Sequence, residues 1–224
     1  MVAILPESLG VTAAALSAPL YVAWQVTNEC DLSCRHCIEE SGPGRAFPDE
    51  LSFAQACALI VQIVAAEVPY VALSGGEPLI HPRFFELAGR FRGTGVGLKV
   101  ETNGQRLTPE NCARLKDLDV KAVQVSLAGT DDETFRSLRP GGRFQAVLDG
   151  IRELRRLGVP VEVNFAPTRG NVSRIAAAVD LAWELGARAF YTGRLMYTGH
   201  AVRFWDQIVP SEEQYADFFA ALKD

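Results

Sequence analysis

Short apolar segments alternate with segments of helical periodicity along most of the chain. The apolar segments are rich in Val, Phe, Tyr and Leu, and several are nearly continuous, which is typical of parallel strands covered on both faces. The predicted strands are Leu20–Thr27, Tyr70–Ser74, Gly97–Thr102, Ala122–Leu127, Val161–Phe165 and Arg188–Thr192.

Helical segments lie between these strands. Ser52 and Thr108 are suitable N-caps, Pro109 suits a first helical position, and Gly158 and Gly186 stand where a helix should end. The predicted helices are Ser52–Glu67, Pro82–Phe91, Thr108–Lys116, Arg143–Leu157 and Ser173–Leu185.

The alternation predicts an α/β fold with parallel strands joined by right-handed crossovers. Six strands are too few for a closed eight-stranded barrel, so two architectures remain: an open doubly wound sheet and a six-stranded partial barrel. In both, the functional site forms at the carboxyl ends of the strands. The sequence contains no repeat of fixed period and no long linker.

Composition and charge narrow the function classes. The 224 residues are 48% hydrophobic and 22% charged, which predicts a packed core, and the net charge of −5 argues against a nucleic-acid-binding surface. The most apolar candidate for a membrane span, 11–24, is interrupted by Ser17 and Pro19. Because the first basic residue is Arg35, a secretory signal is not indicated. We expect a cytoplasmic protein without membrane or nucleic-acid partners.

Three of the five cysteines lie within eight residues, in the pattern C-x3-C-x2-C formed by Cys30, Cys34 and Cys37. Thiolates so close together suit an iron–sulfur cluster, and three ligands would leave one iron of a four-iron cluster open. Two other interpretations stay open at this point: a Cys3His zinc site that uses His36, and the buried face of a helix. An odd number of cysteines disfavours a disulfide framework.

The candidate residues outside the C-x3-C-x2-C motif have ordinary structural interpretations. Cys57 and Cys112 lie on predicted helices and resemble buried small hydrophobic residues, and Trp24 belongs to the core. His81 precedes a predicted helix and His200 follows a turn, and either could approach a substrate. The stretch 39–50 contains Gly and Pro at several positions and is predicted to be a loop.

A second motif, Gly75-Gly76 with Glu77 and Pro78, follows the second predicted strand directly. Paired glycines at a strand end allow a ligand to approach the backbone, although the same residues could form an ordinary turn. Its position, one helix and one strand after the cysteines, strengthens the interpretation as a ligand site.

With both motifs in place, the sequence resembles the radical S-adenosylmethionine (radical SAM) superfamily. The family signature is a C-x3-C-x2-C loop after the first strand followed by a Gly-Gly-Glu-Pro motif after the second, and the aromatic residue that usually precedes the third cysteine is here His36. The resemblance covers about 20–196. Later segments resemble the branch that carries a C-terminal auxiliary-cluster domain, of the SPASM or twitch type: 101–104, 125–127 and 135–139.

The resemblance implies a six-stranded partial (β/α)6 barrel and two cofactors. Cys30, Cys34 and Cys37 would ligate three irons of a [4Fe–4S] cluster, and S-adenosylmethionine would chelate the fourth through its amino and carboxylate groups. The backbone of 75–77 in the Gly-Gly-Glu-Pro motif would receive the methionine amino group. Residues near His36 and at 195–196 would flank the adenine.

Two further residues match family contacts to the methionine carboxylate, Ser126 and Arg139. A guanidinium suits that role because it pairs with a carboxylate through two hydrogen bonds. The alternatives are an ordinary strand serine and a surface arginine at a helix end. Ala128 replaces an Asp that many relatives carry, so any role that depends on that carboxylate is in doubt.

The implied activity is reductive cleavage of S-adenosylmethionine to a 5′-deoxyadenosyl radical that abstracts a hydrogen atom from the substrate. No catalytic side chain is needed beyond the cluster and the cofactor. The predicted substrate is a peptide or protein, and the second choice is a tetrapyrrole or another small biosynthetic intermediate. The predicted electron donor is a flavodoxin- or ferredoxin-like protein. A zinc-binding or electron-transfer module without catalytic activity is the alternative from another class.

The predicted domain organisation has an N-terminal extension at 1–19, a radical SAM core at 20–200 and a C-terminal helix at 201–224. The final helix would carry an apolar stripe that includes Tyr215 and Phe218. Because the matching branch of the family continues into a cysteine-rich region, we expect these residues to be the catalytic core of a longer protein.

Overall fold

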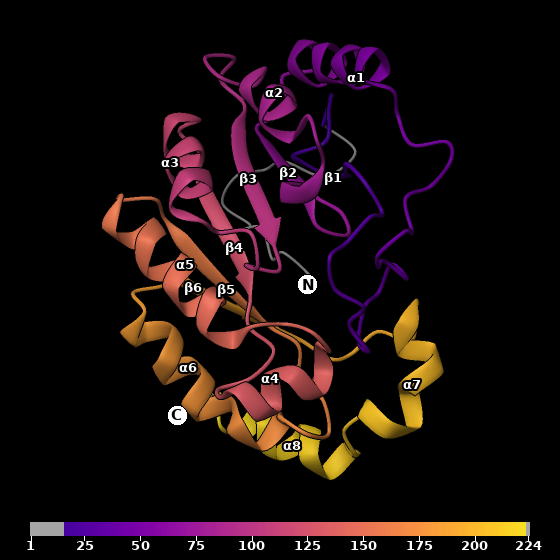
Figure 1. Ribbon diagram of the computed structural model, residues 1–224, viewed down its shortest axis with the longest axis vertical. Helices are drawn as coiled ribbons and strands as arrows, with labels where there is room; N and C mark the ends of the chain where they lie inside the picture. Colours follow the sequence, from indigo (N-terminus) through magenta and orange to yellow (C-terminus); the bar gives the residue numbers. More distant parts are fainter. Residues whose placement is uncertain (1–15, 223–224) are drawn as a thin grey trace.

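The computed structural model describes residues 16–222 and contains one six-stranded sheet in which all strands are parallel. The order of the strands in the sheet is their order along the chain. The strands are β1 (Tyr21–Gln25), β2 (Tyr70–Ser74), β3 (Gly97–Thr102), β4 (Ala122–Ser126), β5 (Val161–Phe165) and β6 (Ala189–Thr192). The sheet curves into a partial barrel (Figure 1). The barrel stays open between β1 and β6, because these strands are the two ends of the order and do not pair with each other. The predicted partial barrel is confirmed, and the open doubly wound sheet is excluded.

Helices follow the strands and cover the outer face of the sheet (Figure 1). They are α1 (Phe53–Ala65), α2 (Phe84–Gly89), α3 (Pro109–Asp117), α4 (Asp132–Leu138), α5 (Phe144–Arg156), α6 (Ile175–Glu184), α7 (His200–Ile208) and α8 (Glu212–Ala220). Two 3-10 turns, η3 (Pro78–Ile80) and η4 (Val172–Arg174), complete the described secondary structure. Where the sequence predicted one helix after 200, the structure has two, α7 and α8.

Local sequence explains where these helices begin and end. The Ser52 side chain accepts a hydrogen bond from Gln55, whose side chain accepts one from the Ser52 backbone in return, and together they form a capping box. At the start of α3 the Thr108 side chain accepts a hydrogen bond from the Asn111 N–H, next to Pro109 at the first helical position. Gly158 and Gly186 both adopt a φ of +72°, as predicted for residues that end a helix.

The hydrophobic core lies between the outer face of the sheet and the helices. Side chains such as Val100 and Val125 on the strands and Leu115 and Ile151 on the helices are fully buried there, and Trp24 belongs to the same cluster. Burial of this kind supplies most of the stabilisation of an α/β domain.

The inner face of the sheet differs from the prediction. Buried apolar residues alternate along the strands with partly exposed polar ones, such as Lys99 and Glu101 on β3 and Gln124 and Ser126 on β4. The expectation that the strands are apolar on both faces is therefore wrong, because every second side chain points to an open barrel interior rather than to a second helical layer.

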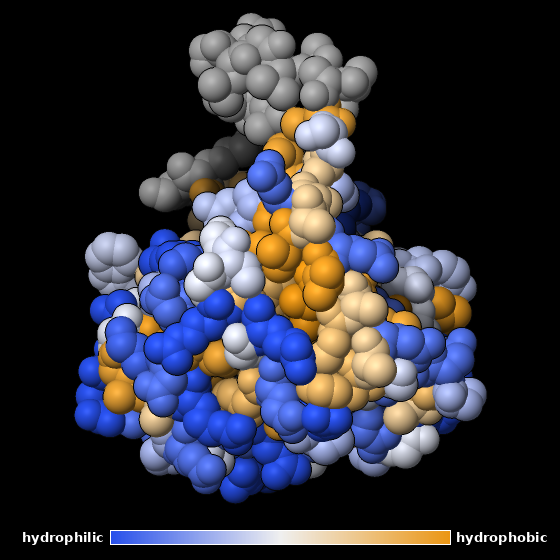
Figure 2. All heavy atoms as spheres, turned by 90° about the horizontal axis from the view of Figure 1, so that it is seen from above, coloured by the Kyte–Doolittle hydropathy of each residue, from blue (hydrophilic) through white to orange (hydrophobic). Residues whose placement is uncertain are grey.

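No helix among residues 16–222 combines the length and the apolar character that crossing a bilayer requires. The surface seen from above in Figure 2 is largely hydrophilic, with an apolar strip. α1, the uppermost helix in Figure 1, contributes exposed Val61 to the molecular surface. Part of the apolar segment 11–24 lies outside the described residues.

Candidate functional site

The three clustered cysteines lie on the loop that follows β1. Cys30 is buried, whereas Cys34 and Cys37 are partly exposed. The backbone N–H of Leu32 donates to Cys30 Sγ at 3.5 Å, and that of Glu39 donates to Cys37 Sγ at 3.4 Å. A turn closed by the Cys37 N–H and the Cys34 carbonyl, 3.2 Å apart, brings the last two cysteines to one side of the loop.

The glycine motif lies directly beside this loop. Gly76 N–H donates to the Thr27 carbonyl and Glu77 N–H to the Glu29 carbonyl, both at 2.8 Å, so the loop after β2 continues the parallel pairing with β1. A Cβ at Gly76 would lie 2.1 Å from the Glu29 oxygen, and Gly75 has a φ of +147°. Only glycine fits this close approach, and the backbone of this turn lines the cavity beside the cysteines.

The Glu77 side chain turns away from that cavity into the protein. Its carboxylate is fully buried and accepts hydrogen bonds from the Thr102 hydroxyl at 2.8 Å, the Asn103 N–H at 2.7 Å and the Leu79 N–H at 3.1 Å. Burial raises the pKa of Glu77 to about 7, and these three hydrogen bonds oppose the rise. The carboxylate thus joins the loop after β2 to the loop after β3, and Pro78 begins η3 next to it.

Asn103 connects the parts of the site. Its side-chain amide donates to Cys30 Sγ at 3.6 Å and to Asp31 Oδ1 at 2.8 Å, while its backbone N–H donates to Glu77. Its carbonyl accepts from Arg139 Nη1 at 3.4 Å. One buried residue therefore contacts the cysteine loop, the glycine motif and the predicted carboxylate-binding arginine.

Arg139 is buried rather than at the surface, which removes the alternative of a surface arginine at a helix end. Its guanidinium lies 5.5 Å from the Phe135 ring centre, and its Nε has no hydrogen-bond partner among the described residues. Burial raises the pKa of Cys34, and the positive charge of Arg139 opposes that rise. No carboxylate within residues 16–222 forms an ion pair with Arg139, so its buried charge is suited to an anionic ligand.

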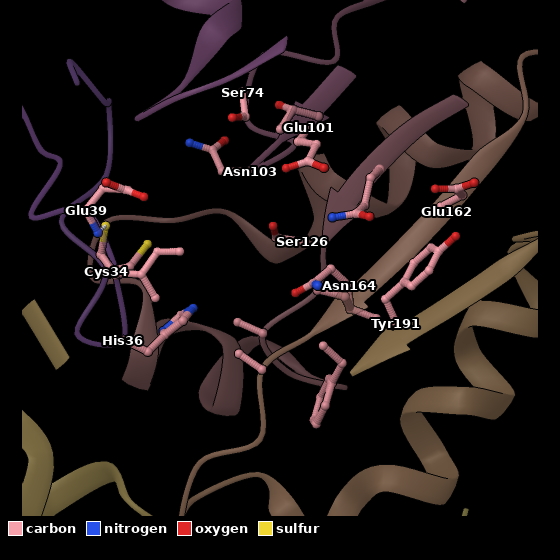
Figure 3. A pocket seen from close by; sticks show the side chains of 18 of the residues that line it. Cys34, His36, Glu39, Ser74, Glu101, Asn103, Ser126, Glu162, Asn164 and Tyr191 are labelled. Carbon is pink, nitrogen blue, oxygen red and sulfur yellow. Dashed lines mark hydrogen bonds between the residues drawn. The ribbon is translucent and has the colours of Figure 1, made fainter. Parts of the chain in front are cut away.

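A cavity of about 1130 Å³ is lined by the three cysteines, the two glycines of the turn, Asn103 and Arg139. Figure 3 shows Ser126, Asn164 and Asn103 around it, with Cys34 and His36 on the cysteine-loop side. His36 Nδ1 is buried and has no hydrogen-bond partner among the described residues, and burial, together with the Arg139 charge, lowers the pKa of His36 to about 3. Its ring is therefore neutral and has a nitrogen available to a ligand. Residues 195–196 line the same cavity.

The other two cysteines lie away from this cavity. Cys112 is fully buried on α3, where its thiol donates to the Gly150 carbonyl at 3.9 Å. Cys57 lies partly buried on α1 and packs against the core. Both positions agree with structural roles.

The two histidines singled out in the sequence do not line the cavity. His81 follows η3, and its Nδ1 accepts from the Arg83 N–H at 3.3 Å. His200 begins α7, and its Nδ1 lies 3.3 Å from the Cys34 carbonyl. His200 therefore contacts the backbone of the cysteine loop without lining the cavity.

The donor set fits an iron–sulfur cluster. Backbone and side-chain N–H groups directed at the cysteine sulfurs are suited to thiolates, and hydrogen bonds to sulfur are a feature of cluster sites. Burial raises the pKa of Cys30 to about 12, so metal coordination is what would deprotonate this thiol. Across residues 16–222, no three His, Cys, Asp or Glu side chains stand close enough to share a single metal ion, and the zinc site with His36 gains no support.

The sequence analysis did not identify the polar side chains that line the inner face of the barrel. A signal for them was present, because in β3, β4 and β5 every second residue is polar. These residues are Lys99, Glu101, Gln124, Glu162 and Asn164.

Comparison with known families agrees with this geometry. The profile of the Radical SAM superfamily matches residues 24–182, a segment that contains the cysteine loop, the glycine motif and Arg139. The chain belongs to the radical SAM superfamily. It is therefore a member of a superfamily of enzymes, as predicted.

Radical SAM relatives with curated names include maturases and synthases. Mycofactocin maturase MftC of Mycobacterium tuberculosis is 34% identical over 205 residues, which are 91% of this chain and 52% of the relative. AdoMet-dependent heme synthase of Methanosarcina barkeri is 36% identical over 199 residues, which are 88% of this chain and 56% of the relative. The chain thus spans about half the length of the curated relatives it matches.

Solved radical SAM structures share the fold. SuiB of Streptococcus suis bound to S-adenosylmethionine superposes with a TM-score of 0.71 at 20% identity, covering 80% of this chain and 41% of that one. Methylornithine synthase PylB superposes with a TM-score of 0.68 at 16% identity, covering 90% and 61%. The partial barrel inferred from the resemblance is thereby confirmed as the radical SAM fold.

Proposed function

We propose that this chain is the core of an enzyme that holds a [4Fe–4S] cluster through Cys30, Cys34 and Cys37 and binds S-adenosylmethionine beside it. The observation that carries this proposal is the convergence of the three cysteines, the glycine turn and the buried Arg139 on one cavity. When bound, the reduced cluster supplies an electron that cleaves S-adenosylmethionine into methionine and a 5′-deoxyadenosyl radical.

The chain's own residues bind and orient the cofactor in this proposal. Backbone carbonyl groups of the turn at Gly75, Gly76 and Glu77 accept hydrogen bonds from the methionine amino group, and Pro78 fixes the end of the turn. Arg139 binds the methionine carboxylate through its unpartnered Nε edge, and Ser126 contributes a hydroxyl from β4. His36 and 195–196 flank the adenine on the same side of the cavity.

No protein acid or base is required for this step, because the sulfonium is cleaved by an electron rather than by a proton. The protein contributes orientation and the exclusion of water around a reactive intermediate. The electron donor would be a flavodoxin- or ferredoxin-like protein that approaches the exposed side of the cysteine loop.

We propose that the substrate is a peptide or protein side chain. The name of the relative MftC describes a maturase, and the neighbour SuiB was solved with a precursor peptide, which supports this choice. The second candidate is a tetrapyrrole, since two other groups of relatives carry the names heme synthase and pre-heme d1 synthase. An auxiliary-cluster domain after residue 224 stays a prediction.

The deciding experiment measures 5′-deoxyadenosine after anaerobic reconstitution with iron and sulfide and reduction with dithionite. We expect product from the wild type and none from Cys34→Ala, whose iron content should fall, while Cys57→Ala and Cys112→Ala keep both. Normal iron in Cys34→Ala, or no 5′-deoxyadenosine from a fully loaded wild type, would contradict the proposal.

Substrate class is tested by adding candidates to the same reaction. Short peptides encoded beside the gene and, in parallel, a tetrapyrrole are supplied in deuterated form, and transfer of deuterium into 5′-deoxyadenosine is read by mass spectrometry. Deuterium transfer from the peptide to 5′-deoxyadenosine supports a peptide substrate. Transfer from the tetrapyrrole alone would show that the substrate is a tetrapyrrole instead.

A further inference from the structure

A belt of charged and polar side chains surrounds the cavity below the cysteine loop. We call it the inner belt and define it by six residues that lie on the strands or directly before one of them: Tyr21, Lys99, Glu101, Gln124, Glu162 and Arg188. In the strand register, Glu101 of β3 stands beside Gln124 of β4, which stands beside Glu162 of β5. None of these side chains contacts the cysteines, and the proposed cleavage of S-adenosylmethionine does not use them.

Both cations of the inner belt form ion pairs with the single carboxylate of Glu162. Arg188 donates to Glu162 Oε1 from Nε at 3.1 Å and from Nη2 at 2.7 Å. Lys99 Nζ lies 2.9 Å from Glu162 Oε2 and donates to Gln124 Oε1 at 2.7 Å. An anionic ligand would have to compete with Glu162 for both cations.

Glu101 is the acidic residue of the inner belt with the longer and weaker contacts. Its nearest cation is Lys99 at 3.8 Å, and the Tyr21 hydroxyl donates to Oε1 at a long 3.4 Å. The second carboxylate oxygen accepts no hydrogen bond from any described residue, and 31% of the side chain is exposed. Figure 3 shows this carboxylate directed into the cavity near Ser74 and Asn103.

We propose that Glu101 is a specificity-determining residue that binds a cationic group of the substrate, a primary ammonium or a guanidinium. The inference rests on the proposed function, because it takes the cavity to be the place where the substrate reaches the cofactor. A hydrogen bond between a cation and a carboxylate is stronger than a neutral one, and it strengthens further in a confined cavity.

The surroundings of Glu101 favour a cation carried on an alkyl stem. The rings of Tyr21 and Tyr191 line the same cavity and offer apolar faces to such a stem. The Tyr191 face already lies 4.9 Å from Lys99 Nζ, so it is placed to accept a positive charge.

The test is a titration of the full chain, ring-labelled with ¹³C at tyrosine, observed by NMR. The probes are butylammonium, butylguanidinium, neutral 1-butanol and anionic butyrate, which share an alkyl stem and differ in the head group. We expect saturable shifts of Tyr21 and Tyr191 with one or both cations, at an affinity at least tenfold above that of 1-butanol and butyrate. The two cationic arms distinguish an ammonium from a guanidinium.

Three variants complete the test. Glu101→Gln keeps the size of the side chain but should abolish the preference for cations, whereas Glu101→Asp should retain it at reduced affinity. Glu110→Gln, on the exposed first turn of α3, should bind the probes like the wild type.

The proposal is overturned if no cation gives a saturable shift, if butyrate or 1-butanol binds as tightly, or if Glu101→Gln keeps the preference. The titration needs neither S-adenosylmethionine nor a reductant. A failure of 5′-deoxyadenosine formation therefore counts against the proposed function alone, and a failure of the titration counts against Glu101 alone.

Discussion

At the scale of single residues, the site depends on polar groups that are buried beside one another. Asn103, Glu77 and Arg139 are each less than a tenth exposed, and each contacts at least one of the others. Asn103 was part of a segment that resembled one branch of the family, yet its contacts with Cys30 and Glu77 could not be read from the sequence. They depend on how closely the loops after β1, β2 and β3 approach in space.

Arg139→Ala should weaken binding of S-adenosylmethionine without removing the cluster. The loss of a charge-assisted contact to a carboxylate should cost roughly 1.5–3 kcal/mol, or about ten- to a hundredfold in affinity. Calorimetric titration of the reconstituted variant measures this change, with iron content as the control. An unchanged dissociation constant would indicate that Arg139 has a purely structural role.

Glu77 should make the protein less stable as the pH rises. Because burial raises the pKa of Glu77 from 4.5 to about 7, the folded state holds this proton more tightly than the unfolded state does. Stability contributed by the group is therefore present below about pH 4.5 and decreases as the pH rises to 7, by about 3 kcal/mol.

Urea denaturation of the wild type and of Glu77→Gln between pH 4.5 and 8 tests this prediction. The stability advantage of the wild type should shrink as the pH rises, because the variant lacks the titrating group. The exposed Glu184→Gln variant on α6 should differ from the wild type by a constant amount. An advantage that grows with pH would show that the hydrogen bonds to the carboxylate outweigh its burial.

At the scale of elements, the strands were the most predictable feature. The bounds of β2, β3 and β5 agree with the prediction residue for residue, since Gly or Pro residues stand at or near both ends of each strand. α7 was missed because it begins after Gly199 without a side-chain cap and buries only part of its surface. The polar inner face of the barrel was not predicted. Alternation of apolar and polar residues shows which side chains share one face of a strand, but it does not show whether that face is covered by helices or lines an open interior.

The ends of β4 and β5 are joined by one buried side chain. The Asn171 amide donates to the Ala128 carbonyl at 2.9 Å and to the Ala166 carbonyl at 3.1 Å, while its oxygen accepts from the Thr168 N–H at 2.6 Å. Where relatives often carry Asp, Ala128 is 1% exposed and contributes its backbone to this junction. The site therefore has no carboxylate at this position.

Asn171→Ala should destabilise the fold by about 1–3 kcal/mol, because it leaves two carbonyls and one N–H without their partner in a buried place. The measurement is the urea midpoint at constant m-value. Asn111→Ala is the matched control, since its amide donates to an exposed carbonyl of Arg106. A midpoint shift no larger than that of the control would mean that water replaces the amide.

At the scale of the whole molecule, the chain returns after β6 to support the cysteine loop. Ala201 N–H at the start of α7 donates to the Cys37 carbonyl at 3.4 Å, and His200 lies against the Cys34 carbonyl. Arg35 extends over the ring of Phe204 at 5.6 Å. α7 lies beside the cysteine loop in Figure 1, so segments from the two ends of the described chain together hold the loop that carries the proposed cluster ligands.

Gly199→Ala should loosen this contact. Gly199 has a φ of +58°, and a Cβ there would lie 2.4 Å from the Ile38 carbonyl carbon and 2.5 Å from the Cys37 carbonyl oxygen. The displaced loop should release iron to a chelator several-fold faster, while far-ultraviolet circular dichroism stays unchanged. Gly170→Ala, where a Cβ meets no atom within 4 Å, should behave like the wild type. Equal release rates in both variants would contradict this role for α7.

The open polar interior also has an evolutionary consequence. Because the apolar core lies outside the sheet, the side chains that face the cavity contribute little to the burial that holds the fold together. Mutations at partly exposed inner positions of β3 and β4 can therefore accumulate at small cost in stability, whereas the loops proposed to hold the cofactors are fixed by buried hydrogen bonds. Such a scaffold can exchange one substrate for another by point mutation while the proposed cofactor site is inherited unchanged, which agrees with maturases and heme synthases both being relatives of this chain.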